Sequence, residues 1–425
     1  MIAWLLISFF VLLFLGVPIA MSLGLSAMGG ILFLGGGSTV TIAQRMFEGM
    51  NSFALLAIPL YTFAGFTMSK GGISKRLMDF CYSIVGHIYG GLAHVNVLSS
   101  MIFAGISGSA VADTAGVSGM FMPEMVRKGY SKNFTVAVTA ISSTIGIIIP
   151  PSIPMVVIAG ICGISTGKLF LGGIIPGVLC GLAQMIVSYF MAKKEGVPKE
   201  PGHFTIGPVL HGLWESWPAL LMPIIIVGTI TMGIVSPTEA GVIAVVYGLF
   251  AGGIIYRELK WEDIKFAFAE TVRTSGRIFI VIGAAKLYTV MLTTAGFDKW
   301  MAKTMLGFST NPTVILIVIL LIFFIVTMFM ESIATLTLFM PILYPIALGV
   351  GINPIVLSVL ITVVIGVGLV TPPVGMCIYV ACDLMDVTVG EVFPTLVPFI
   401  AATFVCIALM VAFPQLILLP TYLMA

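Results

Sequence analysis

The sequence predicts an all-α, polytopic membrane protein, built as an inverted repeat with about ten crossings and two re-entrant helical hairpins. Three observations predict this class. Only 8% of the 425 residues are charged and 59% are hydrophobic, whereas an average soluble protein has about 25% charged residues to cover its surface. Apolar runs of the length that a helix needs to cross a bilayer recur along the chain. A set of landmarks also recurs at nearly fixed spacing in the two halves.

The crossings are expected where apolar runs approach 20 residues. They lie near 2–16, 18–37, 52–69, 133–162, 170–191, 218–236, 239–256, 277–294, 353–382 and 392–415. Two amphipathic stretches, about 203–216 and 261–275, lack such a run and are expected to lie along the cytoplasmic interface. A single membrane domain is predicted, with its halves at 1–200 and 201–425 and a hydrophilic linker at 193–203 between them.

Two further apolar stretches, about 89–126 and 312–350, are too long for one crossing. Small and polar residues interrupt them at 105–114 and 330–337. Non-helical backbone at membrane depth must be buried in protein or line a wet cavity. Helical hairpins that enter and leave on the same side satisfy this rule, so each stretch is predicted to be one.

Lysine and arginine fall in four short groups between the apolar runs, and such groups usually face the cytoplasm. They are Lys70, Lys75 and Arg76; Arg127, Lys128 and Lys132; Lys193, Lys194 and Lys199; and Arg257, Lys260 and Lys265. The first hairpin then opens to the cytoplasm, the second opens to the outside, and both termini are periplasmic. Lys299 and Lys303 fall on the outer side in this arrangement and run against the rule.

Five landmarks repeat in the same order in both halves. Asp113 and Glu331 are 218 positions apart (331 − 113), as are the prolines of two Met-Pro pairs. Two Pro-Pro pairs are 222 positions apart (372 − 150), and two later landmarks keep that distance: Thr166 and Thr388, and Pro176 and Pro398. Each half has an odd number of full crossings, so the halves are inverted. Inverted repeats with broken helices are typical of secondary transporters.

The Pro-Pro pairs lie inside the broken helices predicted at 133–162 and 353–382. Proline has no amide hydrogen, so the carbonyls of the preceding turn lose their partners. In an apolar environment a dehydrated sodium ion could bind those oxygens; a plain kink is the alternative. The hairpin tips add hydroxyls and exposed backbone, although such hydroxyls often bond to their own helix instead. These tip residues are Ser107, Gly108 and Ser109 in the first half and Ser332 and Thr335 in the second.

Intramembrane charges are functional candidates by default. Asp113 and Glu331 are expected at equivalent positions at the two tips, where they balance a cation, line the solute path or cap a helix. Lys286 either pairs with a carboxylate or attracts an anionic solute. Ser152, directly after the first Pro-Pro pair, is a further candidate for the solute path. Glu239 is expected to cap the helix that follows Ser236.

No catalytic constellation is present in the sequence, so the chain is predicted not to be an enzyme. GISTGK at 163–168 has the wrong spacing for a phosphate-binding loop. The six cysteines show no metal-binding spacing. No basic patch suggests nucleic acid as a partner.

Three blocks of sequence resemble the large membrane subunit of TRAP transporters, the tripartite ATP-independent periplasmic family. They are GGLAHVNVLSSMIFAGISGSAVADTAGVSGMFMPEMVRKGYS at 90–131, IGIIIPPSIPMVVIAG at 145–160 and SPTEAGVIAVVYG at 236–248. The resemblance covers essentially the whole chain. It implies the fold of the ion-transporter superfamily and an elevator mechanism. It also implies two partners, a small four-helix membrane subunit and a periplasmic substrate-binding protein.

The resemblance also implies two sodium sites between hairpin tip and broken helix. Carried over, the first site matches Ser107, Gly108, Ser109 and Pro150, and the second matches Ser332, Thr335, Val370, Thr371 and Pro372. The implied substrate is a small organic anion, such as a C4-dicarboxylate, a keto acid or sialic acid. The chain is therefore predicted to be a sodium-coupled importer in a bacterial inner membrane. The alternatives are a stand-alone sodium/carboxylate symporter or exchanger, and a channel or scaffold subunit.

Overall fold

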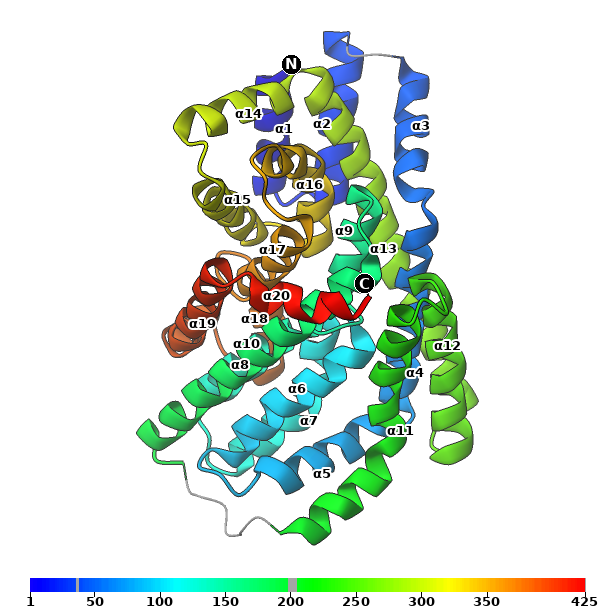
Figure 1. Cartoon of the computed structure of the whole chain (residues 1–425), viewed down its shortest axis with the longest axis vertical. Helices are drawn as coiled ribbons and strands as arrows, with labels where there is room; N and C mark the ends of the chain where they lie inside the picture. Colours follow the sequence, from blue (N-terminus) through cyan, green and yellow to red (C-terminus); the bar gives the residue numbers. More distant parts are fainter. Residues whose placement is uncertain (36–37, 198–204, 425) are drawn as a thin grey trace.

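The computed structural model describes residues 1–35, 38–197 and 205–424, and these fold into helices joined by turns (Figure 1). The α-helices are α1 Ile2–Phe14, α2 Ile19–Leu34, α3 Thr39–Met50, α4 Ala57–Lys70, α5 Ile73–Val85, α6 Gly91–Ser107, α7 Ala110–Arg127, α8 Lys132–Ser143, α9 Ile153–Cys162, α10 Thr166–Lys194, α11 Ile206–Thr231, α12 Pro237–Phe250, α13 Trp261–Thr294, α14 Phe297–Phe308, α15 Pro312–Thr327, α16 Ser332–Gly349, α17 Pro354–Gly368, α18 Met376–Met385, α19 Val389–Ala412 and α20 Gln415–Leu418. Short 3₁₀ or π segments are η1 Phe53–Leu56, η2 Thr144–Ile147, η3 Ala251–Ile255 and η4 Leu419–Met424. Seven of the described helical stretches are long and apolar enough to cross a membrane. The prediction of an all-helical polytopic membrane protein is confirmed.

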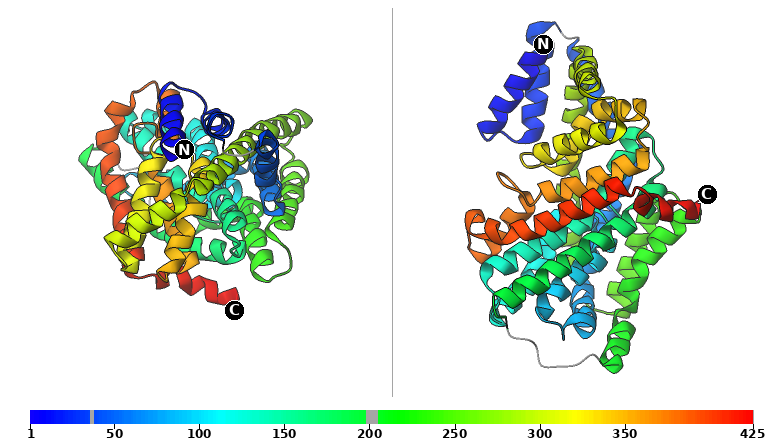
Figure 2. Two further views of the ribbon diagram at one scale, coloured as in Figure 1. Left: turned by 90° about the horizontal axis from the view of Figure 1, so that it is seen from above. Right: turned by 60° about the vertical axis from the view of Figure 1, so that its left-hand side comes forward.

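The helices form an outer and an inner group. In the outer group α13 packs against α2, α3 and α4, and α12 packs against α4 and α11. In the inner group α10 and α19 lie side by side and cross the middle of the molecule (Figure 2). Both helices contact α8 and α17. The inner group also contains α6, α7, α9, α15, α16 and α18. The two groups meet where α16 contacts α13, where α6 contacts α4 and where η1 contacts α9.

Both predicted hairpins form as pairs of consecutive helices. In the first, α6 and α7 pack together around a turn at Gly108 and Ser109. Gly108 has φ of 65°, a conformation that costs glycine little because it has no Cβ. In the second, α15 and α16 pack together around residues 328–331. The interruptions read from the sequence therefore mark real breaks between helices.

Both long helices that contain a Pro-Pro pair are broken, as predicted. The first runs as α8 and η2, loses helical structure after Ile147, and resumes as α9. The second runs as α17, breaks between Leu369 and Gly375, and resumes as α18. The bonds Pro150-Pro151 and Pro372-Pro373 are both cis.

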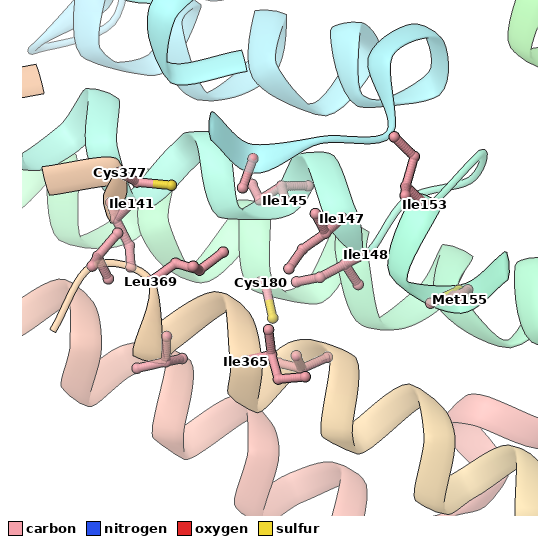
Figure 3. Packing of buried hydrophobic residues seen from close by; sticks show 14 of the residues in the cluster. Ile141, Ile145, Ile147, Ile148, Ile153, Met155, Cys180, Ile365, Leu369 and Cys377 are labelled. Atoms are coloured by element: carbon pink, nitrogen blue, oxygen red, sulfur yellow. The ribbon is translucent and has the colours of Figure 1, made fainter. Parts of the chain in front are cut away.

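The helix boundaries keep a constant register between the halves. The 18-residue helices α7 and α16 begin 222 positions apart (332 − 110). The helices α8 and α17 also begin 222 positions apart (354 − 132). Thr144 and Gly366, again 222 apart, contact each other: a Cβ on Gly366 would lie 3.3 Å from that of Thr144. The broken helices therefore cross at matching positions, where isoleucines of η2 face Ile365 and Leu369 (Figure 3).

The two amphipathic stretches were predicted wrongly as separate elements. Residues from Ile206 onward form the first part of α11, and 261–275 form the first part of α13, each continuous with the apolar segment that follows. A helix of 26 or 34 residues carries its hydrogen-bond ladder through a change of polarity, so composition alone does not end it. The predicted linker and Lys199 fall mostly on 198–204, outside the described residues.

The chain segments that carry the four basic groups contact one another in pairs. Arg76 forms a 2.7 Å ion pair with Glu258, which joins the first group to the fourth. The hydroxyl of Ser131 donates to Glu195 at 3.0 Å, which joins the second group to the third. The end of α10, the start of α11 and α5 lie at the lower end of the molecule in Figure 1, whereas α14, with Lys299 and Lys303, lies at the upper end.

Candidate functional site

The first hairpin tip packs directly against the first break. The backbone amide of Ile153 donates to the carbonyl of Gly108 at 3.1 Å. A Cβ on Gly108 would lie 2.7 Å from the carbonyl oxygen of Pro151, so only glycine allows this approach. Among the described residues, no hydrogen bond ends on the carbonyl oxygens of Pro150 and Pro151. Tip and break thus bring the unpaired carbonyl oxygens of Pro150 and Pro151 close to the turn at Gly108.

Asp113 is fully buried beside this tip. The hydroxyl of Ser107 donates to its Oδ1, while Oδ2 has no hydrogen-bond partner among the described residues. Oδ2 lies against Gly146 of η2, where a Cβ would overlap it. A buried acceptor oxygen without a partner is costly, so the geometry suits a cation next to Ser107 and the first break.

The second tip repeats the connection to its own break. The amide of Val374 donates to the carbonyl of Met328 at 3.0 Å. The carbonyl oxygens of Val370, Thr371 and Pro372 receive no hydrogen bond among the described residues. Both halves therefore join a hairpin turn to the chain just after a Pro-Pro pair.

The hydroxyls of the second tip and break are engaged in local bonds. Thr335 donates to the carbonyl of Glu331 at 3.1 Å, and Thr371 donates to that of Val367 at 2.7 Å. Ser332 donates to the Glu331 carboxylate at 2.7 Å. Each hydroxyl oxygen keeps lone pairs that could bind a cation.

Asp113 and Glu331 are not equivalent in the structure, which corrects the prediction. Glu331 is the N-cap of α16, and its carboxylate accepts from the amides of Ile333 and Ala334 at 3.0 and 3.3 Å. The N-cap of α7 is instead Ser109. Asp113 lies one turn further into its helix, at the position that corresponds to Thr335. The 218-residue spacing differs from the 222-residue register by about one helical turn, so it keeps the same helix face.

Four helix N-termini belong to the tips and breaks. They begin at α7 and α16 after the tips, and at α9 and α18 after the Pro-Pro pairs. Helix N-termini carry partial positive charge, which suits an anion. Ser109, Ser152 and Glu331 already cap α7, α9 and α16 and each leave part of the first turn unbonded. The hydroxyl of Ser152 is the N-cap of α9: it donates to the carbonyl of Ile147 at 2.5 Å and accepts from the amide of Met155 at 3.3 Å. Ser152 is thus placed at the first break in a capping role.

Two residues at the site were missed in the sequence. Cys377 is buried in the first turn of α18, which packs against α7, the helix that carries Asp113. Gly146 makes room for the Asp113 carboxylate. The signal for Gly146 was its position just before the first Pro-Pro pair, but one glycine among 47 carries little information.

Lys286 does not join the tips. It lies on α13 and lines a separate cavity with residues of α3, α9 and α16. Glu239 has the predicted capping role, because it completes a capping box with Ser236 at the start of α12. Glu239 therefore has a structural role at the start of α12, whereas Lys286 faces a cavity.

The family model for the DctM component of the tripartite ATP-independent periplasmic transporter matches residues 6–416. The chain belongs to the DctM family. This is a family of transport permeases, so the prediction that the chain is not an enzyme is confirmed. The resemblance stated from the sequence is confirmed as well.

Curated relatives of this DctM protein span nearly all of it. It is 37% identical, over 92% of its length, to the isethionate TRAP transporter permease protein DctMQ of Oleidesulfovibrio alaskensis, and the match spans 62% of that longer protein. It is 35% identical, over 96% of its length, to the sialic acid TRAP transporter large permease protein SiaM of Vibrio cholerae, and the match covers 95% of SiaM.

The fold of this DctM protein also resembles a solved transporter. The crystal structure of the Alcanivorax borkumensis YdaH transporter matches with a TM-score of 0.59 at 13% identity, covering 89% of this chain and 88% of that one. At this identity the likeness concerns the fold alone.

Proposed function

We propose that the chain is the large permease of a sodium-coupled, binding-protein-dependent importer of a small organic anion. The observation that carries the proposal is the pair of hairpin tips, each bonded to the broken helix of its own half. Family membership supports secondary transport. The names of relatives that handle isethionate and sialic acid support an organic acid as the solute class. C4-dicarboxylates and keto acids belong to the same class.

Sodium would bind first where the Asp113 carboxylate faces the first tip. Hard cations take oxygen ligands, and the residues present offer them: Ser107, Asp113 and the carbonyls around Pro150. The unpartnered Oδ2 of Asp113 supports this fit, because a cation there would remove the cost of a buried bare acceptor. Gly108 and Ser109 form the turn of this tip, in which Gly108 is buried against the break.

The second sodium would bind between the second tip and Pro372. The oxygens available are the hydroxyls of Ser332 and Thr335 and the free carbonyls of Val370 and Thr371. No counterpart of Asp113 is present at the matching position, where Thr335 stands. The second site should therefore bind sodium more weakly than the first.

The anion would then bind between the helix N-termini of the tips and breaks. Partial positive charge at these ends attracts a carboxylate or sulfonate, and sodium bound on either side adds to it. Asp113 and Glu331 remain candidates for lining the path of the solute. Glu331 would act by capping α16 at the second tip, and Asp113 would act by binding the sodium ion at the first tip. Cation and anion together bring the net charge of the loaded region closer to zero, which lowers the cost of moving it past lipid.

Movement would follow an elevator scheme. The inner group, with both hairpins and both broken helices, would slide against the outer group as a body. The halves 1–200 and 201–425 would form an inverted repeat, an assignment supported by the 222-residue register of helix starts. The basic groups would face the cytoplasm of a bacterium and both termini its periplasm. Contacts between the chain segments that carry these groups support one shared end.

Two partners would complete the machine: a small four-helix membrane subunit and a periplasmic substrate-binding protein. The test is uptake into proteoliposomes that contain both membrane subunits, with the binding protein outside and sodium gradients imposed in either direction. We expect labelled anion to accumulate only with inward sodium and binding protein. Uptake without the binding protein would indicate a stand-alone symporter, and a current far faster than carrier turnover would indicate a channel.

A further inference from the structure

A cavity distinct from the hairpin tips lies where α3 and α13 of the outer group meet α9 and α16 of the inner group. Its volume is about 190 Å³, and its lining includes Glu48, Ser52, Gly160, Lys286 and Thr337. Thr337 lies six residues past Glu331 on α16, or about 9 Å along the helix. Gly160 lies eight residues past Ser152 on α9, or about 12 Å. The cavity thus lies a few turns along α16 from the second tip and a few turns along α9 from the first break.

Lys286 supplies an unusual charge to this cavity. It is the only charged residue between Arg277 and Asp298, in the apolar part of α13. Within the described part of the chain, its ammonium group forms no ion pair or hydrogen bond. A Cβ on Gly49 would lie 2.6 Å from Cβ of Lys286, so the lysine stem is packed tightly against α3. A cation at membrane depth with no protein partner is a candidate for binding a ligand.

The neighbouring carboxylate does not neutralise Lys286. Glu48 lines the same cavity and lies within electrostatic range of the lysine, but its carboxylate is bound by Arg45 at 2.7 Å. The three side chains together carry a net charge of +1. Arg45 does not line the cavity, but it pairs with Glu48 and leaves Lys286 as the lining charge without an ion-pair partner among the described residues, so Lys286 would attract an anion.

Two hydroxyl groups line the cavity, those of Thr337 and Ser52, and only one of them has a proton available for a ligand. Thr337 donates its proton to the carbonyl of Ile333 at 2.7 Å, so it has none to offer. The Ser52 hydroxyl forms no hydrogen bond with another described residue. Lys286 and Ser52 are thus the two donors that an acidic group in the cavity could use.

We propose that this cavity is a waypoint site for an organic anion, in which Lys286 pairs with the acidic group of the solute before the solute reaches the tips. The inference rests on the proposed function. Pockets for whole drug-sized ligands hold about 300–1,000 Å³, so this smaller cavity takes one acidic group and a few carbon atoms. Because its walls come from both helix groups, sliding of the inner group changes its shape and releases the anion.

Transport kinetics test the site in the complete reconstituted complex. Succinate, N-acetylneuraminate and isethionate serve as labelled probes, and the one that the unaltered protein imports is used throughout. Lys286→Gln should raise the KM for that probe at least ten-fold with kcat within two-fold, while Lys286→Arg retains most of the affinity. Lys299→Gln, on α14 outside the cavity, is the matched control and should change neither parameter. An unchanged KM in Lys286→Gln overturns the proposal.

A double variant separates this role from simple charge balance. If Lys286 served only to offset Glu48, Glu48→Gln with Lys286→Gln would restore the KM; the proposal predicts that it does not. Failure of the unaltered protein to import any probe would count against the proposed function instead, so the two outcomes are distinguishable.

Chemical modification provides a readout that needs no transport. With Ser52→Cys in the full complex, an anionic methanethiosulfonate reagent should react faster than a cationic one. Adding Lys286→Gln should remove that preference, and millimolar probe should slow the reaction. Equal rates for the two reagents in the presence of Lys286 would overturn the proposal even if Lys286→Gln folded poorly.

Discussion

The amide of Ile153 donates to the carbonyl of Gly108 at 3.1 Å, and this bond ties the first hairpin tip to the helix that resumes after Pro150-Pro151. Val374 and Met328 form the matching bond in the second half at 3.0 Å. In both places a hairpin turn meets a break with unpaired carbonyls. The ion sites proposed here therefore use an arrangement that the protein backbone already holds together.

Gly146→Ala tests the packing of the first site. The added Cβ would overlap Oδ2 of Asp113, and overpacking a tight core costs about 1–3 kcal/mol. We expect the half-saturating sodium concentration for uptake to rise at least ten-fold while the protein still reaches the membrane. Gly119→Ala is the matched control, because a Cβ there meets nothing within 4 Å. Equal sodium dependence in the two variants would show that Asp113 needs no such space.

Asp113→Asn tests whether the carboxylate binds the ion. The amide keeps the size of the side chain and can still accept from Ser107, but it carries no negative charge. We expect half-saturating sodium to rise ten-fold or more, equivalent to about 1.4 kcal/mol, with the KM for the anion at saturating sodium little changed. If uptake by Asp113→Asn depends on sodium concentration in the same way as uptake by the unaltered protein, Asp113 has only a structural role.

Glu331→Ala tests the cap of α16. Its carboxylate accepts two backbone amides at the tip, and loss of an N-cap costs about 0.5–2 kcal/mol. Thermal unfolding of the solubilised protein should show this loss, and Glu331→Asp should recover most of it. Ser236→Ala removes a cap far from the tips. It should lower the melting temperature by a similar amount and leave the half-saturating sodium concentration for uptake unchanged. A stable but sodium-insensitive Glu331→Ala would instead make Glu331 an ion ligand.

Sodium itself should stabilise the purified protein. A ligand that binds only the folded state at 100 times its Kd adds about 2.7 kcal/mol. We expect the melting temperature to rise with sodium chloride and not with equimolar potassium or choline chloride. In Asp113→Asn the rise should be reduced, since only the second site remains. Identical melting curves in sodium and potassium would argue against both sites.

The sequence allowed the hairpins and the breaks to be predicted because their signals are local. Two adjacent prolines open a helix when they stand in its interior, and an apolar run of about 40 residues cannot be one crossing. Both signals led to the correct places in both halves. The capping role of Glu239 was predictable for the same reason, since Ser236 and Glu239 lie three residues apart.

Contacts between distant segments could not be predicted in this way. The helices α3, α5 and α14 were missed because they are short and amphipathic, and such helices depend on tertiary packing for stability. The contact of Asp113 with Gly146, and the cavity around Lys286, each join segments that no spacing rule connects. Pairing Asp113 with Glu331 placed the two residues at equivalent positions, an error of one helical turn. The spacing did not reveal the error, because a shift of four residues preserves the face of a helix.

The central claim is that sodium and the anion move together through the two tips. The most direct measurement is the influx of radiolabelled sodium into proteoliposomes that contain the full complex, with and without the imported anion. We predict that the anion, delivered by the binding protein, stimulates sodium influx in a fixed ratio, and that Asp113→Asn lowers this ratio. Sodium influx that is the same with and without imported anion would contradict the claim.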